Sequence, residues 1–362
     1  MRQSPLQPLH HPDTDYRTSG DSVVAASCQG LEEDYGHVRG RAGLMDLASL
    51  GLTALTGDSD DVESFLNDVL ARDVTYLVPE RSMTSLMLDD DGGAVDVVTI
   101  HRLENGVIVE SSFGNGDRTR EHLRRVLDES AGGLTLTDLG EERTTIGIEG
   151  PYSWAEIGEV LDQELTALPY ESIVGTEWNG TPMLFARSGF TGEYGYKVIV
   201  DNDHANEVWE RLAQSVPQVG QDALEVAMLE IRQPILAREW TTGSDVVTCG
   251  LNWLVDLSKE AFRGREAVME LTSVARRTVG FRSDSDIKEG TTLELDGTPI
   301  GEVVFTAQSP GLGCHIGLLR IDASLAASGL EISASTPQGE TFDLRTVSSP
   351  YVVPTSWSVP LF

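Results

Sequence analysis

The last part of the sequence places the strongest limit on the fold. From Thr278 to the C-terminus, short segments of alternating apolar and polar residues are separated by Gly, Pro and Asp, and no helical pattern longer than one or two turns remains. This spacing is typical of a small antiparallel barrel or sandwich. We therefore predict a C-terminal β-barrel domain over residues 275–362, with its boundary near Ala275-Arg276-Arg277.

The preceding 274 residues mix helices with strands. In Asp58–Leu70, apolar residues at positions 62, 65, 66 and 69 share one face and follow acidic residues at the N-terminal end. This arrangement predicts an amphipathic helix. Similar patterns recur between short strands without the regular rhythm of a doubly wound fold, so we expect an α+β architecture.

The charge balance is strongly acidic. The chain of 362 residues has 58 acidic against 26 basic side chains, a net charge of −32, and three lysines: Lys197, Lys259 and Lys288. Carboxylates repel one another over roughly 10 Å at 0.1 M salt, and over about 3 Å at 1 M. We therefore predict a halophilic protein, whose negative surface argues against nucleic acid or an anionic membrane as partner.

The sequence contains no targeting or metal-binding signal. No run approaches the 18 or so apolar residues of a membrane span, and Met1–Asp21 is polar, without the apolar core of a signal peptide. The three cysteines are isolated and the seven histidines are scattered along the chain, so no metal site is predicted. We expect a cytoplasmic protein.

Motifs for nucleotide binding and serine hydrolysis are absent. The turns Gly114-Asn115-Gly116 and Gly189-Phe190-Thr191-Gly192 lack phosphate-loop spacing, and acidic residues follow both. No GxSxG nucleophile elbow occurs.

Six other stretches run in order through nearly the whole chain: Arg41–Leu47, Asp91–Asp96, Gly147–Pro151, Arg187–Tyr196, Gly250-Leu251 with Trp253, and Lys259–Glu266. They resemble the segments "aGLfDvS", "GGxxDD", "alqGP", "R(T)GyTGEdGyE" and "GLgW…K.dFiGrea" of the glycine-cleavage T-protein (aminomethyltransferase) family, which includes other folate-dependent one-carbon transferases. The chain is thus similar to this family as a divergent member.

The resemblance implies three subdomains around a central cavity that takes tetrahydrofolate. Residues 1–274 would then form a folate-binding region of two interleaved subdomains, and the barrel would be the third. The implied partners are folate and a small-molecule one-carbon donor. A carrier protein is a less favoured partner.

Three positions depart from the family pattern. The second Asp of "GGxxDD", the main catalytic group of aminomethyltransferases, is Val97 here, whereas Asp96 aligns with the first Asp. Because side chains alternate along a strand, Asp96 and Val97 should face opposite ways. The Glu that binds the pterin corresponds to Lys197, and an Arg before the "LRlEaG" stretch corresponds to Leu224.

These alignments yield candidate site residues. Asp96 is the candidate catalytic residue, and Tyr194, Lys197 and Glu230 are the candidate cofactor-binding residues, Glu230 through the "LRlEaG" stretch. Structural roles compete with each assignment: a turn-capping carboxylate for Asp96, a packed aromatic for Tyr194 and a salt bridge for Lys197.

Three functions are compatible with this pattern. The favoured one is a folate-dependent aminomethyl- or methyltransferase of altered specificity. The first alternative is a non-catalytic folate- or ligand-binding accessory protein, although Ala261 replaces the cysteine of the iron–sulfur-linked branch. The second alternative is an authentic glycine-cleavage aminomethyltransferase. Tetrahydrofolate is the suspected cofactor, although the accessory protein could hold another ligand. The departures from the family pattern at Val97, Lys197 and Leu224 argue against folate binding.

Overall fold

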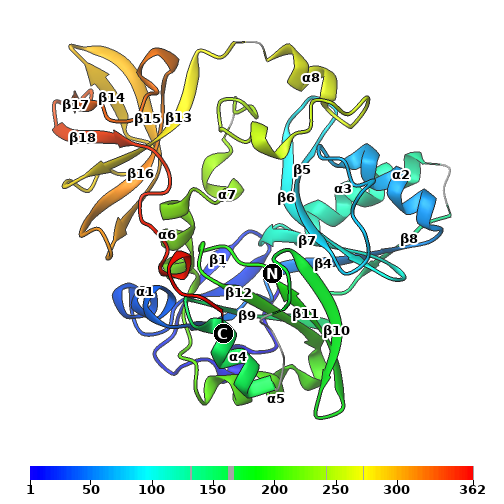
Figure 1. The fold of residues 1–362 in the computed structure, drawn as a ribbon. Helices are drawn as coiled ribbons and strands as arrows, with labels where there is room; N and C mark the ends of the chain where they lie inside the picture. The colour runs from blue at the N-terminus through cyan, green and yellow to red at the C-terminus, as the bar shows by residue number, and fades with distance from the viewer. Residues whose placement is uncertain (131–132, 162–166, 242, 272, 362) are drawn as a thin grey trace.

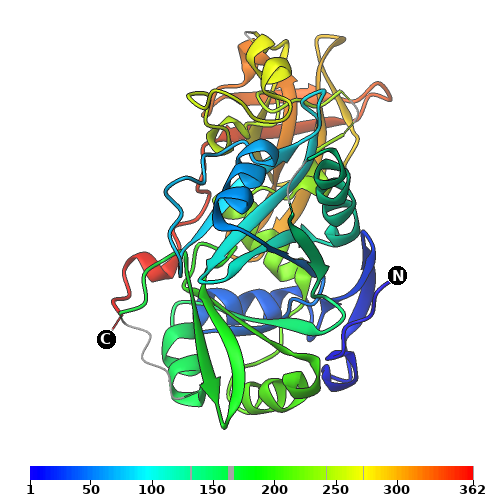
Figure 2. The same ribbon diagram turned by 90° about the vertical axis from the view of Figure 1, so that its right-hand side faces the viewer.

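The described part of the protein contains a two-stranded sheet, two five-stranded sheets and one closed barrel, with helix α6 between the lobes (Figures 1 and 2). The computed structural model describes residues 1–130, 133–161, 167–241, 243–271 and 273–361. Mixed helices and strands with a closed antiparallel barrel at the C-terminal end confirm the predicted α+β fold class.

The first sheet is antiparallel, with strand order β5-β6-β7-β4-β8. Helices α2 and α3 pack against one face of it (Figure 2). Helix α2 confirms the amphipathic pattern of the sequence: Asp58 caps its N-terminus by accepting from the Asp60 amide, and its four predicted apolar residues are buried. The elements are β4 (Leu50–Thr56), α2 (Ser59–Val69), β5 (Ser82–Leu88), β6 (Ala94–Leu103), β7 (Gly106–Phe113), α3 (Gly116–Glu129) and β8 (Thr135–Asp138).

The second sheet has strand order β10-β11-β12-β9-β3 and is also antiparallel. Its helices α4 and α5 cover one face, and its first strand precedes the whole first sheet in sequence, so the two sheets are interleaved along the chain. The elements are β3 (Gly43–Asp46), β9 (Arg143–Glu149), α4 (Ser153–Leu161), β10 (Ser172–Trp178), β11 (Thr181–Arg187), β12 (Gly195–Asp201) and α5 (Asn202–Ala213).

Alternate side chains of β7 pack on opposite sides of the first sheet, and one set contacts the second sheet. On β7, Val107 and Val109 point toward α2 and α3, whereas Ile108 packs against Ile199 of β12 in an apolar cluster between the sheets. The next residue on this inner face of β7 is Glu110. The inner face of β7 therefore changes from the apolar Ile108 to the charged Glu110 between two successive residues on that face.

The third lobe is a closed barrel with strand order β13-β16-β15-β14-β17-β18. Its interior is filled by aliphatic residues and Phe281. Closure removes free sheet edges, which explains how strands this short form a stable domain. The strands are β13 (Arg276–Ser283), β14 (Thr292–Leu295), β15 (Thr298–Ser309), β16 (Cys314–Asp322), β17 (Glu331–Ser335) and β18 (Thr341–Val347).

Helix α6 connects the lobes at the centre of the molecule (Figure 1). It contacts α1, β2, β15 and β16, and every residue from Gln221 to Glu230 except Asp222 is buried. The remaining elements are β1 (Asp15–Ser19), β2 (Ser22–Ser27), α1 (Leu31–Gly40), α6 (Gln221–Ile231), α7 (Leu236–Glu239), α8 (Arg265–Glu270) and the 3-10 turns η1 (Gln7–Leu9), η2 (Asn252–Leu254), η3 (Ala323–Leu325) and η4 (Thr355–Trp357).

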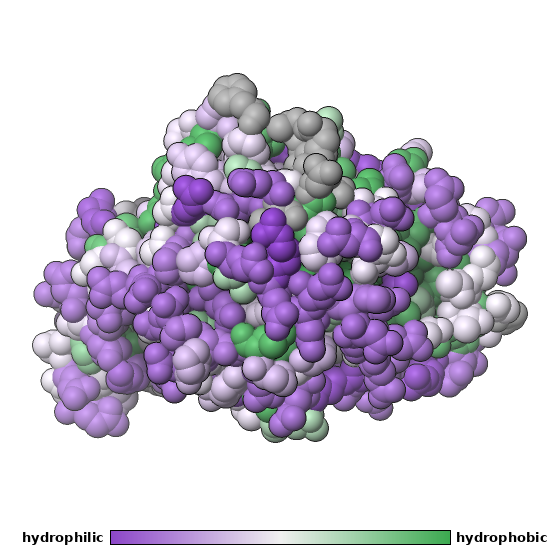
Figure 3. Space-filling model, turned by 90° about the horizontal axis from the view of Figure 1, so that it is seen from below, coloured by the Kyte–Doolittle hydropathy of each residue, from purple (hydrophilic) through white to green (hydrophobic). Residues whose placement is uncertain are grey.

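The face of the molecule seen in Figure 3 is dominated by hydrophilic residues. Lysine contributes little to the surface: Lys197 and Lys259 are buried, and Lys259 donates to three backbone carbonyls. Lys288, by contrast, has a side chain that is 77 % exposed. In the part of the chain that the structure describes, none of the helices has the length and apolar character needed to cross a membrane.

Candidate functional site

A cavity lies where the first sheet, the loop after β11 and helices α6 and α7 meet. It encloses about 580 Å³ of empty space, part of which is open to solvent. The lining comes from segments far apart in the sequence: Ser19, Thr84, Val97, Thr99, Glu110–Phe113, Phe190, Gln221, Glu225, Met228 and Gln233–Ala237.

The inner faces of β6 and β7 form one wall. Thr99 pairs with Glu110 across the two strands, and Val97, two residues before Thr99, lies on the same face. A side chain at position 110 is therefore a near neighbour of one at position 97. Val97 stands at the position that the sequence resemblance aligns with the family's catalytic Asp. The carboxylate of Glu110 lies on the adjacent strand β7, where Glu110 pairs with Thr99.

Glu110 belongs to a buried polar chain beneath this wall. Its Oε1 accepts from Lys197 Nζ at 2.5 Å, and its Oε2 lies 3.5 Å from His101 Nε2. His101 Nδ1 shares a hydrogen bond of 2.8 Å with Ser82 Oγ. All four side chains are buried. Glu110 Oε2 and His101 Nε2 are both buried, and among the described residues each faces the other and has no closer polar partner.

Electrostatics keep Glu110 ionised. Burial works to raise the pKa of this carboxyl, but the Lys197 ammonium and the neighbouring His101 outweigh it and hold the pKa at about 2. An ionised carboxylate is a strong acceptor for N–H or O–H groups. Glu110 thus gives the cavity wall a negative charge, with Oε1 bonded to Lys197 and Oε2 facing His101.

Two aromatic rings stand beside this carboxylate. Phe113 and Phe190 both line the cavity, with ring centroids 5.2 Å apart and planes tilted by 56°. The Lys197 ammonium lies 4.2 Å from the centroid of the Phe190 ring, so it is bound by both the carboxylate and the ring face. Apolar rings next to a charged acceptor suit a flat ligand with polar edges.

Glu225 is a second carboxylate in the lining. It accepts from Arg17 Nη2 at 2.5 Å, from Arg238 Nη2 at 3.0 Å and from Gln221 Nε2 at 3.0 Å. Its charge is therefore balanced by two arginines that reach it from β1 and α7.

Asp96, the candidate catalytic residue, faces away from the cavity, as the alternation along β6 predicts. Its carboxylate is fully buried and accepts from Ser112 N and Oγ and from Thr119 Oγ1 of α3. Burial raises the pKa of this carboxyl despite these donors. These contacts tie β6 to β7 and α3, a structural role at the back of the cavity wall.

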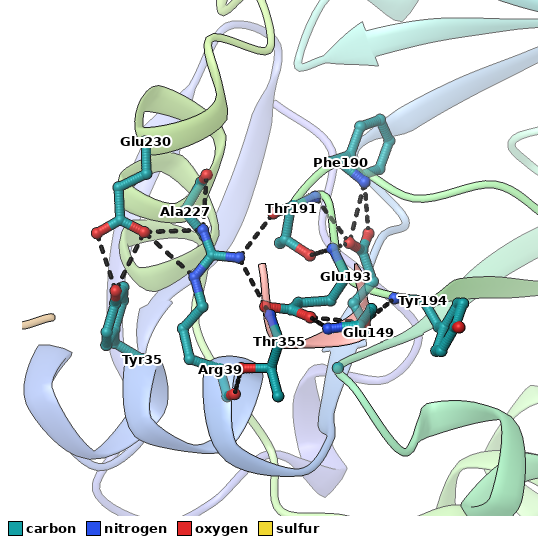
Figure 4. A network of polar contacts seen from close by, with 12 residues as sticks. Tyr35, Arg39, Glu149, Phe190, Thr191, Glu193, Tyr194, Ala227, Glu230 and Thr355 are labelled. Atoms are coloured by element: carbon teal, nitrogen blue, oxygen red, sulfur yellow. Dashed lines mark hydrogen bonds and ion pairs between the residues drawn. The ribbon is translucent and has the colours of Figure 1, made fainter. Parts of the chain in front are cut away.

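The candidate cofactor-binding residues are not brought together. Lys197 lies directly behind the wall through Glu110 and Phe190. Tyr194 Oη instead donates to the backbone of Val359 near the C-terminus. Glu230 accepts from Arg39, Tyr35 and Ser309 in a buried network between α1, α6 and β15 (Figure 4). Neither Tyr194 nor Glu230 lines the cavity.

Leu224 also lies outside the lining. Its side chain is 1 % exposed and packs in the apolar cluster around α6. The replacement of an arginine at this position therefore changes the core as well as any ligand contact. Within the described residues, no group of three or more His, Cys, Asp or Glu side chains is placed to hold a metal ion.

Sequence reasoning did not find Glu110 or Glu225, although both line the cavity. The segment Gly106–Phe113 reads as a strand, and the one signal at Glu110 is a charged residue that follows four largely apolar ones. Recognising it needs the strand pairing, which places position 110 opposite Thr99 and beside Val97.

Comparison with known proteins gives the same family from sequence and from fold. The family model "GCVT N-terminal domain" matches residues 12–259, and "Glycine cleavage T-protein C-terminal barrel domain" matches residues 276–352. The chain is 27 % identical to an aminomethyltransferase of Parafrankia sp. (strain EAN1pec), over 97 % of this chain and 98 % of that protein. It is 29 % identical to an aminomethyltransferase of Synechococcus elongatus, over 84 % and 83 % respectively.

A solved structure supports the same assignment at the level of fold. The glycine cleavage system aminomethyltransferase T from Bartonella henselae superposes with a TM-score of 0.88 at 22 % identity, covering 98 % of both chains. The two family models together span both sheets, the central helices and the barrel. The chain belongs to the glycine-cleavage T-protein family.

Proposed function

We propose that this protein is a folate-dependent one-carbon transferase of the aminomethyltransferase kind. The names of its relatives favour this function over a non-catalytic binding protein. The observation that carries the proposal is Glu110, a buried, ionised carboxylate among the residues that line the central cavity.

The residues present fit tetrahydrofolate. Ligand cavities commonly combine apolar walls with few polar groups, and this one has two phenylalanines beside Glu110. The pterin ring is flat and carries amino and ring N–H donors along one edge. Such an edge suits a carboxylate such as that of Glu110, whereas Lys197 alone would offer it no acceptor.

In the proposed transfer reaction, the residues around the cavity have separate roles. When bound, tetrahydrofolate would supply the nitrogens that accept the one-carbon unit. Glu110 binds and orients the ligand, and its negative charge stabilises positive charge that develops nearby. Lys197 holds Glu110 in place and ionised. Phe113 and Phe190 exclude water, which strengthens these electrostatic interactions.

Val97 supports a second candidate, the altered specificity expected from the sequence, or binding without transfer. With valine in the wall, the cavity has no carboxylate at the family's catalytic position. Glu110 is one strand away, and a carboxyl with a pKa of about 2 is a weak proton acceptor at neutral pH. Donors that need a strong base at position 97 would then react slowly.

A transfer assay separates the two candidates. Ammonia release from an aminomethyl-lipoyl carrier protein would be measured with and without tetrahydrofolate, in molar potassium chloride. The proposal expects folate-dependent release by the wild type, lowered at least about tenfold in Glu110→Gln. The matched control is Glu340→Gln, which removes the same charge from an exposed barrel residue and should leave release unchanged.

The other outcomes assign the function differently. Folate binding without ammonia release would favour the second candidate, and Val97→Asp should then create release. If the wild type neither binds tetrahydrofolate nor releases ammonia, the proposal is wrong.

A further inference from the structure

The chain ends in a segment that leaves the barrel and crosses to the loop between β11 and β12; we call residues 350–361 the C-terminal strap (Figure 1). Its first part is anchored twice. Tyr351 N donates to Glu230 O of α6 at 2.6 Å, and Tyr351 Oη donates to Gly317 O of β16 at 3.2 Å.

The middle of the strap binds one buried carboxylate, Glu193. Glu193 Oε2 accepts from Ser356 N at 2.8 Å and from Ser356 Oγ at 2.6 Å, and Oε1 accepts from Thr355 N at 3.1 Å. Arg39 Nη1 donates to the same Oε1 at 3.0 Å. Figure 4 shows Arg39 lying between Glu193 and Glu230, with Thr355 beside it.

Further contacts continue along the same loop. Tyr194 N donates to Ser356 Oγ at 2.9 Å, and Tyr194 Oη donates to Val359 O at 2.6 Å. Gly192 has φ +78°, and a Cβ there would come within 3.0 Å of Pro354 Cγ. The strap and the loop thus approach closely at a backbone position that glycine alone adopts readily.

The loop held by the strap also supplies part of the cavity wall. Phe190 lines the cavity, and its amide and that of Thr191 donate to the buried carboxylate of Glu149 at 2.9 Å. Arg39 Nη1 donates to Thr191 O at 2.8 Å. Glu193 therefore lies three residues from a cavity-lining ring and shares Arg39 with the backbone that carries it.

The exposed fractions of the strap's side chains indicate which contacts hold it in place. Two of its apolar side chains, Val353 and Trp357, are 73 % and 67 % exposed, whereas Ser356 is buried against Glu193. Near the barrel, Tyr351 packs against the apolar cluster around α6. The hydrogen bonds of the strap with the β11–β12 loop are made by Thr355, Ser356 and Val359.

We propose that the C-terminal strap is a positioning element for the cavity, in which Ser356 and Glu193 fix the β11–β12 loop and thereby hold Phe190 in the cavity wall. Ligand affinity then depends on residues of the strap that do not touch the ligand. The proposal stands on the strap geometry, and only its affinity readout rests on the proposed folate function.

Hydrogen–deuterium exchange of the Phe190 and Thr191 amides tests the proposal without any ligand. These amides are bonded to Glu149, which the strap does not contact in the described structure. Ser356→Ala should speed their exchange at least about fivefold. Ser358→Ala, whose hydroxyl bonds only the strap's own Thr355 carbonyl among the described contacts, should leave it unchanged.

The affinity readout uses tetrahydrofolate as the probe. The dissociation constant should rise about tenfold in Ser356→Ala and stay unchanged in Ser358→Ala. A chain ending at Ser349 should show the same two effects, and a peptide of residues 350–361 added in trans should reverse them. Unchanged loop exchange in Ser356→Ala and in the shortened chain would overturn the proposal. Faster loop exchange in Ser356→Ala, together with no tetrahydrofolate binding by the wild type, would support the strap proposal. It would contradict only the proposed folate function.

Discussion

Replacing Lys197 by methionine should remove the ammonium group that pairs with the buried Glu110 carboxylate. Methionine retains the length of the side chain and its contact with Phe190, but leaves Glu110 without its cation. Removing one member of a buried ion pair costs about 3–5 kcal/mol of unfolding free energy. For a chain of this size, the melting temperature should fall by roughly 5–10 °C.

The loss should depend on pH in a defined direction. In the wild type, the folded-state pKa of Glu110 is about 2, below its ordinary value of 4.5, so the pair adds stability above pH 4.5 that is lost as the pH falls toward 2. Without Lys197, burial raises that pKa above 4.5 and stability is lost as the pH rises. The difference between the two proteins should therefore grow from about pH 4 to about pH 7.

Thermal melts in 3 M potassium chloride provide the assay, because salt screens a buried pair far less than surface charges. Lys288→Met removes an exposed lysine and should melt within about 1 °C of the wild type. Glu110→Gln/Lys197→Met should recover at least about half of the loss. A Lys197→Met protein that melts like the wild type from pH 4 to 8 would refute the reasoning.

Three other outcomes follow from the same structure. The melting temperature should rise steadily between about 0.1 and 3 M potassium chloride, because screening relieves repulsion within the net charge of −32; a flat curve would remove the halophilic assignment. Leu224→Ala should cost about 2–5 kcal/mol of stability in denaturant melts without changing folate affinity, and weaker binding at unchanged stability would place Leu224 at the site. Asp96→Asn should destabilise by about 1–3 kcal/mol because its donors lose an acceptor, whereas lost transfer at full stability would make Asp96 catalytic.

Much of the fold could be predicted from the sequence because its signals are local. The alternating segments after Thr278 contain their own turns, and the barrel they form has β13 beginning at Arg276. The apolar spacing of Asp58–Leu70 needs only helical periodicity, and α2 follows it. Interleaving of the two sheets has no local signal, and it entered through the resemblance of six short motifs.

The candidate site could be predicted less well, because it depends on contacts between residues that are far apart in the sequence. The alternation along β6 correctly separated Asp96 from Val97, but the partner strand could not be read from the sequence, so Glu110 remained hidden. Tyr194 and Glu230 lie in motifs whose neighbours are distant in sequence: Tyr194 bonds the strap at Val359, and Glu230 bonds α1. The motifs that contain Tyr194 and Glu230 therefore include residues that join the lobes as well as residues that line the cavity.

The central claim is that the cavity binds tetrahydrofolate through Glu110. A calorimetric binding isotherm for tetrahydrofolate in 3 M potassium chloride tests it most directly. We expect saturable one-site binding by the wild type and by the exposed-charge control Glu340→Gln. In Glu110→Gln, and in Glu110→Gln/Lys197→Gln, which leaves no unpaired lysine, the dissociation constant should rise at least about tenfold. A wild type without saturable binding, or Glu110 variants that bind as tightly as the wild type, would contradict the account.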